Sequence, residues 1–439
     1  MSNYKPYREY KDSKVSWLTD IPKHWEIKRL KFAVNLIGEK LEAESSELSY
    51  IGLEHIDSWS GKLIEDGNAT SQGIASRFRP DDVLFGKLRP YLAKVHLARH
   101  EGLVSTEALV LRPSLSVHAG FLRYYMVSRD FIRTVDSSTY GSKMPRASWN
   151  FIGNLPILLP EDDEQKAIAR FLDFKTSQID ALVAQKETFL KKLAEKRMAL
   201  INHTVTRGLD PQVQMKDSGV EWLGRVPEHW DIKRLKNLAT YNDEALDEKT
   251  DPDFEMEYVD ISSVNLVDGI TSTEITSFEN APSRARRKVR HGDTIISTVR
   301  TYLKAIAAIK NPPENLIVST GFAVIRPITG IDPNYLSYLL QSEGFVGAVV
   351  ANSVGVSYPA INASVLAALP AVLPPTDEQQ LISRFLDAKT IEIDNLISKV
   401  TKAIEKLKEY RLALITQAVT GKIDVRQVRI SDSKIGEAA

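Results

Sequence analysis

The residues best placed to do chemistry in this 439-residue chain are arginines, lysines and tyrosines gathered in a few short tracts. Residues 284–304 contain seven basic side chains against one acidic side chain, and residues 76–101 contain six against three. Residues 123–146 contain five against two, although the formal net charge of the chain is zero. Clusters of this kind bind phosphate groups and release counterions. The neutral total means that such a surface must come from uneven placement of charge.

Residues arranged for catalysis are not found. Asn311-Pro312-Pro313-Glu314 superficially resembles an amino-methyltransferase motif, but Glu314 stands where a flipped base would need an aromatic ring. His96 and His100 lack the intervening glutamate of a zinc protease. The chain has no cysteine, which excludes disulfides and thiolate metal sites. We therefore expect a recognition protein without metal or cofactor of its own.

Targeting signals are also missing from the sequence. The first residues, MSNYKPYREYKD, lack the apolar core of a signal peptide. No apolar run approaches the ~18 residues that a membrane helix needs. We expect a cytoplasmic protein with no membrane partner.

The chain repeats itself. WLTDIPKHWEIKRLK, which begins at Trp17, returns as WLGRVPEHWDIKRLK at Trp222, and VSTEALVLRP at Val104 returns as VSTGFAVIRP at Val318. The offset grows from 205 to 214 and then stays constant, so the second copy has its insertions early. Two copies of this length indicate a tandem duplication of one module. The repeated Pro-His-Trp phrase is expected to be structural, with its tryptophans in the core or where a module meets its helix.

Each copy ends in a stretch without proline or glycine, which predicts a helix of roughly 40 residues, about 60 Å long. Asp162 with Gln165, and Thr376 with Gln379, fit capping boxes at the two helix starts. Apolar residues recur every seven positions, which favours a coiled coil over two separately packed helices. Two rows are predicted in each copy: Leu172, Ile179, Leu193, Leu200 with Ile168, Leu182, Phe189, and Leu386, Ile393, Val400, Leu407, Leu414 with Ile382, Leu396, Ala403, Tyr410.

The remainder of each copy mixes short β-rich runs with helical segments and a loop marked by glycine and proline, at 138–150 and 352–362. The expected fold class is α+β, with two tandem bodies related by a pseudo-twofold axis and joined by two long antiparallel coiled-coil helices. The expected division of the chain is 1–159 as first body, 160–207 as central helix, 208–373 as second body, 374–421 as second helix and 422–439 as tail.

Together these motifs resemble the DNA-specificity subunit of type I restriction-modification enzymes. The resemblance covers nearly the whole chain and depends on the repeated head phrase, on DVLFGKLRPYLAKV and VSTxxxVxRP, and on the LPxxLPxxDEQ start of each helix. It implies two target recognition domains that each read half of a split, asymmetric double-stranded DNA site. It also implies assembly with two methyltransferase subunits, which use S-adenosylmethionine to methylate adenine. Motor-nuclease subunits that use ATP and magnesium complete the implied complex, and this chain is implied to have no activity alone.

The candidate DNA contacts come from the basic tracts and the glycine loops. Arginine suits bidentate guanine contacts and lysine more often holds phosphate. Arg89 and Arg300, with Tyr91 and Tyr302, occur in both copies. They are therefore expected to hold the DNA backbone in position or to be structural, and not to read bases. A solvated face is the competing interpretation of any one arginine, and the acidic stretch 243–260 is expected to be a solvated loop without a role in binding. The full set is Lys87, Arg89, Tyr91, Lys94, Lys143 and Arg146 in the first copy, and Arg286, Arg287, Lys288, Arg290, Arg300, Tyr302, Lys304 and Tyr358 in the second.

Two other functions fit the same features. One is a DNA-binding adaptor or repressor outside restriction. The other is a scaffold whose twin modules hold two identical protein partners. Co-purification with a methyltransferase would separate the resemblance from the scaffold, and methylation at a gapped motif would separate it from the repressor.

Overall fold

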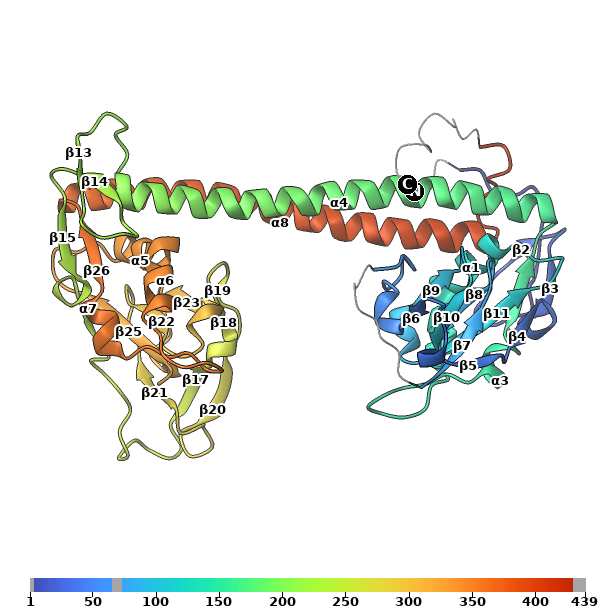
Figure 1. Ribbon diagram of the computed structural model, residues 1–439, viewed down its shortest axis with the longest axis horizontal. Coiled ribbons are helices and arrows are strands. Elements are labelled where there is room, and N and C mark those ends of the chain that lie inside the picture. Colours follow the sequence, from blue (N-terminus) through green and yellow to red (C-terminus); the bar gives the residue numbers. More distant parts are fainter. Residues whose placement is uncertain (1–3, 65–72, 429–439) are drawn as a thin grey trace. The chain divides into compact units, whose positions relative to one another are not determined.

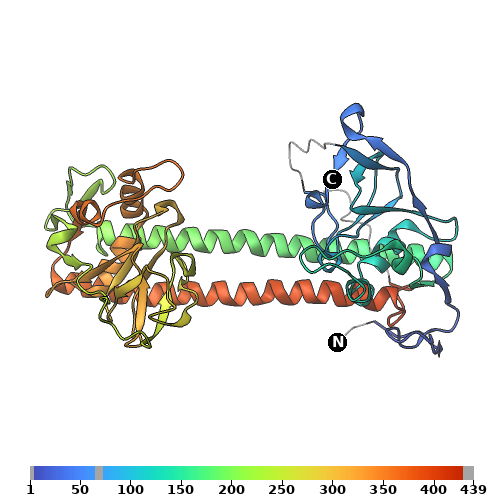
Figure 2. The same ribbon diagram turned by 90° about the horizontal axis from the view of Figure 1, so that it is seen from below.

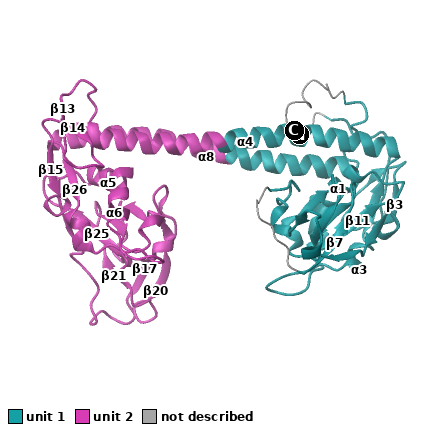
Figure 3. Cartoon of the chain, viewed as in Figure 1, with its two compact units in different colours: residues 1–187, 402–439 teal, residues 188–401 magenta. Residues whose placement is uncertain are grey.

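A computed structural model describes residues 4–64 and 73–428, which form two compact units (Figure 3). Unit 1 consists of Met1–Glu187 and Lys402–Ala439, and unit 2 of Thr188–Thr401. Each unit therefore contains one body and parts of two long helices. Of the predicted tail, residues 429–439 lie outside the described residues.

The body of unit 1 contains two four-stranded sheets, with orders β4-β11-β8-β9 and β5-β7-β10-β6 (Figure 1). All their pairs are antiparallel except β10 with β6. The strands are β4 (Val34–Ile37), β5 (Lys40–Glu42), β6 (Tyr50–Ile51), β7 (Ile74–Phe78), β8 (Val83–Gly86), β9 (Val95–Leu97), β10 (Gly102–Ser105) and β11 (Ala108–Pro113). Two further pairs join β1 (Tyr10–Lys11) to β2 (Ile21–Pro22) and β3 (Glu26–Arg29) to β12 (Pro156–Leu159).

The body of unit 2 has the same pattern, with sheets β16-β25-β22-β23 and β20-β17-β24-β21. The edge strand differs, because β20 pairs with β17 whereas β5 pairs with β7 in unit 1. The strands are β16 (Ala239–Tyr241), β17 (Glu255–Val259), β18 (Val264–Asn265), β19 (Gly269–Ile270), β20 (Glu274–Ser277), β21 (Ala285–Lys288), β22 (Thr294–Ser297), β23 (Ile306–Ala308), β24 (Leu316–Ser319) and β25 (Phe322–Pro327). Further pairs are β13 (Met215–Asp217) with β14 (Arg225–Pro227), β15 (Asp231–Arg234) with β26 (Pro370–Leu373), and β18 with β19.

Short helices cover one sheet of each body. The central strands β8 and β22 are buried along their whole length, although β22 (TIIS) has apolar residues only at its centre, between the buried Thr294 and Ser297. Helix α1 packs against β8 and β9, and α5 packs against β23 and β25 of the corresponding sheet. Each of these helices is started by a side chain that accepts a backbone N–H. The short helices are α1 (Ala119–Met126), α2 (Arg129–Asp136), α3 (Trp149–Ile152), α5 (Pro333–Gln341), α6 (Glu343–Ala351) and α7 (Ala363–Ala368).

The repeated Pro-His-Trp phrase connects each body to the start of a long helix. Trp25 is fully buried, and its Nε1 donates to Glu164 Oε1 at 3.1 Å, while His24 Nε2 lies 2.8 Å from Glu164 Oε2. Unit 2 repeats the arrangement with His229 and Trp230 around Glu378, at 2.8 and 2.9 Å. The structural role predicted for this phrase is therefore confirmed.

The long helices are α4 (Asp162–Arg207) and α8 (Thr376–Val419), and neither is interrupted. Inside unit 1 Asp180 and Glu187 of α4 pair with Arg411 and Lys408 of α8, so the helices run antiparallel there. They lie side by side in each unit (Figure 2). The predicted fold class of two α+β bodies with two long antiparallel helices is confirmed.

One predicted row of each long helix is correct and the other is wrong by one residue. Leu172, Ile179 and Leu193 are buried or nearly so, but the second row runs through Thr176, Val183 and Arg197. In α8 the second row likewise passes through Thr390, Ile404 and Arg411. Of the residues that the sequence placed in the second rows, Ile168 and Ile382 are fully buried and Ala403 is half-buried. The other four are 40–49 % exposed: Leu182, Phe189, Leu396 and Tyr410.

The predicted capping boxes are also wrong. In a capping box the side chain of Gln165 would accept from the backbone N–H of the N-cap residue. Here its Oε1 accepts from His118 N and its Nε2 donates to Pro160 O, each at 2.9 Å. Gln379 does the same with Pro374 O and Asp332 N. These buried amides attach each body to its helix, because they satisfy backbone groups that precede α1 and α5.

Candidate nucleic-acid interface

The predicted contact residues of unit 1 meet where β8 ends. The chain leaves β8 through Lys87 and enters a single 3-10 turn, η4 (Pro90–Leu92), flanked by Arg89 and Ala93. Both flanking residues have left-handed backbone conformations, with φ of 48°. Non-glycine residues adopt this region at a cost, and such positions cluster at functional sites. We call residues 87–93 the corner of unit 1.

A hairpin from the loop between α2 and α3 closes over this corner. Tyr140 and Arg146 exchange two backbone hydrogen bonds, which defines the hairpin as residues 140–146. Arg89 N donates to Pro145 O at 2.8 Å, and Ala147 N donates to Lys87 O at 3.0 Å. The loop extends from the body on the side away from the helices of this unit (Figure 1). Segments more than fifty residues apart in the sequence thus form one surface.

Unit 2 contains the same construction. Its corner, residues 298–304, includes η7 (Thr301–Leu303) between Arg300 and Lys304, again both left-handed. Its hairpin, residues 354–360, is closed by reciprocal bonds between Val354 and Ala360. Arg300 N donates to Pro359 O at 2.7 Å.

The candidate side chains of unit 1 divide into free and engaged groups. Arg89, Tyr91 and Lys143 are exposed, and no hydrogen bond or ion pair of their side chains occurs among the described residues. Arg146 is held by Glu107 at 3.1 Å, and Lys94 Nζ donates to Leu53 O at 2.6 Å. Lys87 is half-buried. The structure therefore brings five of the six together at the corner and hairpin, while the ammonium of Lys94 is directed to a loop of the body.

In unit 2 the corner and hairpin meet through an aromatic stack. The guanidinium of Arg300 lies over the ring of Tyr358, 4.7 Å from its centroid. Tyr302, Lys304 and Tyr358 are all exposed. A stack of this kind contributes about 0.5–1 kcal/mol at an exposed site and orients the guanidinium plane. These four candidates form one cluster.

Three other candidates of unit 2 lie on β21, namely Arg286, Arg287 and Lys288, and Arg290 follows two residues after the strand. A β-bulge between Ala285 and Arg287 inserts Arg286. Arg286 stacks on Phe278 at 4.4 Å. Arg287 Nε is buried without a partner among the described residues, and burial lowers the pKa of this arginine. An arginine that is desolvated without a counter-charge is suited to receive an anion, since the anion would supply the missing partner.

The strand β21 carries its basic residues away from the corner. Its first end is close to the corner, because Thr320 N donates to Arg284 O and Thr298 N donates to Gly321 O. At ~3.3 Å per residue, Arg290 lies about 20 Å further along. Arg290 is also paired with Glu244 at 2.5 Å. The structure therefore does not bring Arg290 together with Arg300.

Two exposed residues near the corners were missed by the sequence prediction. Arg284 stands at the end of β21 beside the corner of unit 2, and Tyr140 begins the hairpin of unit 1 with 63 % of its surface exposed. Arg284 belonged to the basic tract that the sequence identified. Nothing in the local sequence distinguished Tyr140 from a core tyrosine.

The acidic stretch 243–260 is only partly the solvated loop that was predicted. Glu244 binds Arg326 at 2.8 Å as well as Arg290, and residues 255–259 form the strand β17. Arg326 also holds the buried Asp293 through two contacts of 2.8 and 2.9 Å. Part of the acidic stretch thus neutralises arginines of the body of unit 2, since Glu244 pairs with Arg326 and Arg290.

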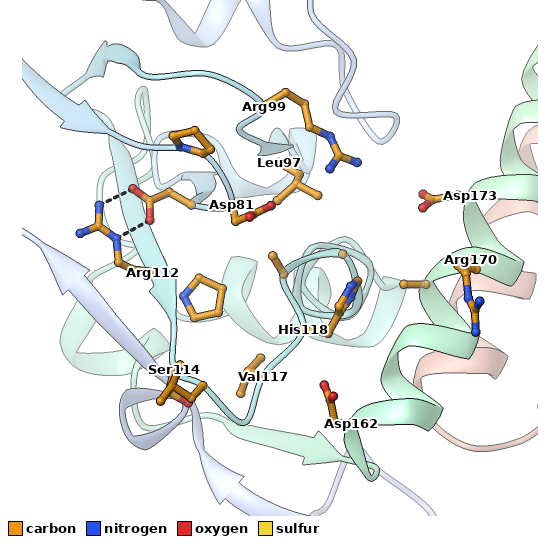
Figure 4. Close-up of a pocket in the computed structure, with 17 residues that line it drawn as sticks. Asp81, Leu97, Arg99, Arg112, Ser114, Val117, His118, Asp162, Arg170 and Asp173 are labelled. Atoms are coloured by element: carbon orange, nitrogen blue, oxygen red, sulfur yellow. Dashed lines mark hydrogen bonds and ion pairs between the residues drawn. The ribbon is translucent and has the colours of Figure 1, made fainter. Parts of the chain in front are cut away.

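A cavity of about 550 Å³ lies between the body of unit 1 and α4 (Figure 4). Arg112 on its wall binds the buried Asp82 through two contacts of 2.8 Å, as Arg326 binds Asp293 in unit 2. Around it Arg99 and Arg170 mix with Asp81, Asp162 and Asp173, so the cavity has no single charge. Within residues 4–64 and 73–428, no group of three or more histidine, aspartate or glutamate side chains could hold a metal ion. Nor does any helix of that part have the length and apolar character needed to cross a membrane.

Comparisons with known proteins identify the class. Residues 227–406 match the family described as type I restriction modification DNA specificity domain. The chain is 23 % identical over 429 residues to the type I restriction enzyme MjaVIII specificity subunit of Methanocaldococcus jannaschii, covering 93 % of this chain and 95 % of that one. A solved structure from work on assembly and conformational transition of the type I R-M system has a TM-score of 0.70 at 20 % identity, over 92 % of this chain and 99 % of that one. The HsdS subunit from Thermoanaerobacter tengcongensis has a TM-score of 0.51 at 19 % identity, over 94 % and 100 %.

The resemblance drawn from the repeated motifs is therefore confirmed. Residues 227–406 carry a type I restriction modification DNA specificity domain, and over most of its length the chain is similar to specificity subunits of type I restriction enzymes.

Proposed function

We propose that this subunit reads a split, asymmetric double-stranded DNA site in the cytoplasm, with one half-site contacted by each body. The corner and hairpin that recur in both units carry this proposal, because the same backbone frame presents different side chains in each. Major-groove edges are read by short sets of donors, acceptors and apolar groups, which the two surfaces supply. Arg284, Arg286 and Arg287 would add phosphate contacts in unit 2.

The subunit itself has no catalytic role in this proposal. Two methyltransferase subunits would bring S-adenosylmethionine and methylate adenine, and motor-nuclease subunits would bring ATP, magnesium and cleavage. The apolar residues that face away from the helix pair support docking of partner helices. Leu182 in unit 1 and Leu396 in unit 2 occupy the same repeat position, and each is about 40 % exposed. Equivalent exposed leucines in the two units suit two copies of one partner.

The test is to assemble the subunit with methyltransferase subunits and map adenine methylation on genomic DNA. The expected result is methylation at one gapped, asymmetric motif that disappears when this subunit is left out. Leu182→Ser with Leu396→Ser should weaken assembly about tenfold or more, since each loses an apolar contact, and should leave the folded subunit intact. Methylation without a motif, or assembly unchanged in the double variant, would contradict the respective part of the proposal. Leu115→Ser, at a fully exposed loop position outside the long helices, is the matched control.

A further inference from the structure

The two hairpins have one backbone and two different tips. Each is tied to its corner by an N–H of the corner arginine and by a strand bridge, Leu88 with Arg146 in unit 1 and Val299 with Ala360 in unit 2. Both hairpins contain a glycine with positive φ, Gly141 at 90° and Gly355 at 117°. A side chain at Gly355 would come within 3.1 Å of Tyr358 O. These shared features set the shape of the hairpin, so they cannot distinguish one DNA sequence from another.

The three residues after each glycine differ completely between the two units, as do the exposed residues that begin the hairpins, Tyr140 and Val354. Unit 1 has Ser142, Lys143 and Met144, and unit 2 has Val356, Ser357 and Tyr358. All six are exposed. Apart from the stack of Tyr358 with Arg300, no side-chain hydrogen bond, ion pair or ring contact of these six occurs among the described residues. Exposed side chains of varied chemistry on a fixed backbone are what base reading requires.

We propose that these two triplets, Ser142–Met144 and Val356–Tyr358, determine which base sequence each body reads. This inference rests on the proposed function and names the part of each body that makes the two half-sites different. Arg89 and Arg300 are common to both corners and contact what the two half-sites share, the phosphate backbone or a common base.

The side chains of each tip indicate which base edges that tip would contact. The tip of unit 1 offers an ammonium and a hydroxyl, which donate to purine N7 and O6 acceptors. The tip of unit 2 offers an isopropyl group that suits a thymine methyl, and a tyrosine ring that fixes the guanidinium of Arg300. The edges of that guanidinium remain unpaired within the described chain, so it can make a bidentate contact to guanine.

The neighbouring differences between the bodies are less suited to base reading. By strand register Ala75, Ser76 and Arg77 of β7 correspond to Ala285, Arg287 and Lys288 of β21. The bulged β21 therefore differs from β7 by two additional arginines, Arg286 and Arg287. A row of cations strengthens attachment to phosphate without separating sequences. The glutamate that holds Arg146, Glu107, is replaced by Gly321 in unit 2, but its carboxylate is already committed to that arginine.

The experiment exchanges the tips one at a time in the complex with methyltransferase subunits. One variant carries Ser142→Val, Lys143→Ser and Met144→Tyr, and the other carries Val356→Ser, Ser357→Lys and Tyr358→Met. Motifs are determined by binding selection from a random DNA library, so that a new specificity is seen whatever sites a genome contains. The expected result is that each exchange changes the bases of one half of the motif by roughly tenfold or more in preference and leaves the other half unchanged. Leu115→Ser should leave both halves unchanged.

Three outcomes decide the matter. Unchanged motifs in both exchange variants would overturn the inference and leave the proposed function standing. A wild-type complex that selects no gapped motif would overturn both. An exchange variant can also melt as wild type does but bind DNA weakly, and then the single changes Lys143→Ala and Tyr358→Ala decide. A relaxed base preference in one half of the motif supports the inference. An equal loss of affinity for all sequences shows that the tips hold phosphate and overturns the inference.

Discussion

The Nε of Arg411 lies 2.8 Å from Oδ1 of Asp180, which joins α8 to α4 inside unit 1. The repeat reproduces this pair in unit 2, where Arg197 lies 3.1 Å from Asp394. Both arginines are nearly buried, so each sits in the seam between helices where an apolar residue would be usual. A polar residue in such a seam fixes the register, because a shifted alignment would bury the charge without a partner.

We predict that Arg411→Leu destabilises unit 1 by about 2 kcal/mol, since Asp180, which is 18 % exposed, loses one of its two cationic partners and keeps only Lys62 at 3.0 Å. The charge-reversed pair Arg411→Asp with Asp180→Arg should recover only a small part of this loss, because the new guanidinium at position 180 would face Lys62. Arg197→Leu is the matched comparison and should cost about 1 kcal/mol, because Asp394 is 47 % exposed and can be hydrated. Hydrogen exchange of the helix amides in each unit measures both effects. Equal losses in the two units would contradict the burial argument.

The junction between body and helix that is built on Glu164 in unit 1 is expected to be stronger than the junction built on Glu378 in unit 2. The carboxylate of Glu164 accepts from Tyr7 Oη at 2.6 Å and from Trp25 Nε1 at 3.1 Å, and burial together with this hydrogen bond raises the pKa of Tyr7. Glu164→Ala leaves these buried donors unpaired and should cost about 2–4 kcal/mol. Glu378→Ala should cost less, because Glu378 is one-quarter exposed. Tryptophan fluorescence during denaturant unfolding reports the loss, and a larger effect at Glu378 would count against this ranking.

Phosphate binding by Arg287 should appear in the salt dependence of DNA affinity. Arg287→Ala is expected to reduce the slope of log affinity against log salt by about 1. Arg290→Ala should change the slope less, because its guanidinium is paired with Glu244. Fluorescence anisotropy with the assembled complex between low and moderate salt measures both slopes. The assignment fails if Arg287→Ala leaves the slope unchanged.

Acid should weaken unit 1 through His96. Burial, followed by the charges of Arg123, His100 and Arg99, lowers the pKa of His96 despite its contact with Gly61 O at 2.8 Å. The folded state therefore binds a proton less readily than the unfolded chain, so stability is full above the unfolded pKa of about 6.5 and declines as the pH falls below it. His96→Asn, which keeps a donor for Gly61 O, should show a smaller loss of melting temperature between pH 7.5 and 5.5 than wild type. An equal loss in both proteins would remove His96 as the cause.

The sequence predicted the fold class because its strongest signals are long-range repeats and a seven-residue period. The period failed at the second row, where Leu182 and Val183, or Ala403 and Ile404, are adjacent apolar residues of which only one faces the seam. The buried Arg197 and Arg411 hid the correct column, since charged residues are not expected there. Only the ion pairs across the helices show which column is inside.

The candidate interface was predictable as a set of charges and not as a surface. Arg89 and Lys143 belong together because Arg89 N donates to Pro145 O, a contact between residues 56 positions apart. The sequence also could not show that Glu107 forms an ion pair with Arg146, or that Glu244 forms one with Arg290. Such pairings depend on how sheets are ordered, and periodicity carries no information about that order.

The division of the units has a consequence for biosynthesis. Unit 2 is complete once residue 401 has left the ribosome, but unit 1 also needs residues 402–428, the last part of the described chain to emerge. The body translated first must therefore wait for its final helix, while the body translated second can finish before it. Nascent chains stalled when residue 401 has just left the ribosomal exit tunnel should protect Trp230 from solvent and leave the surroundings of Trp25 incomplete, an order of folding opposite to the order of synthesis.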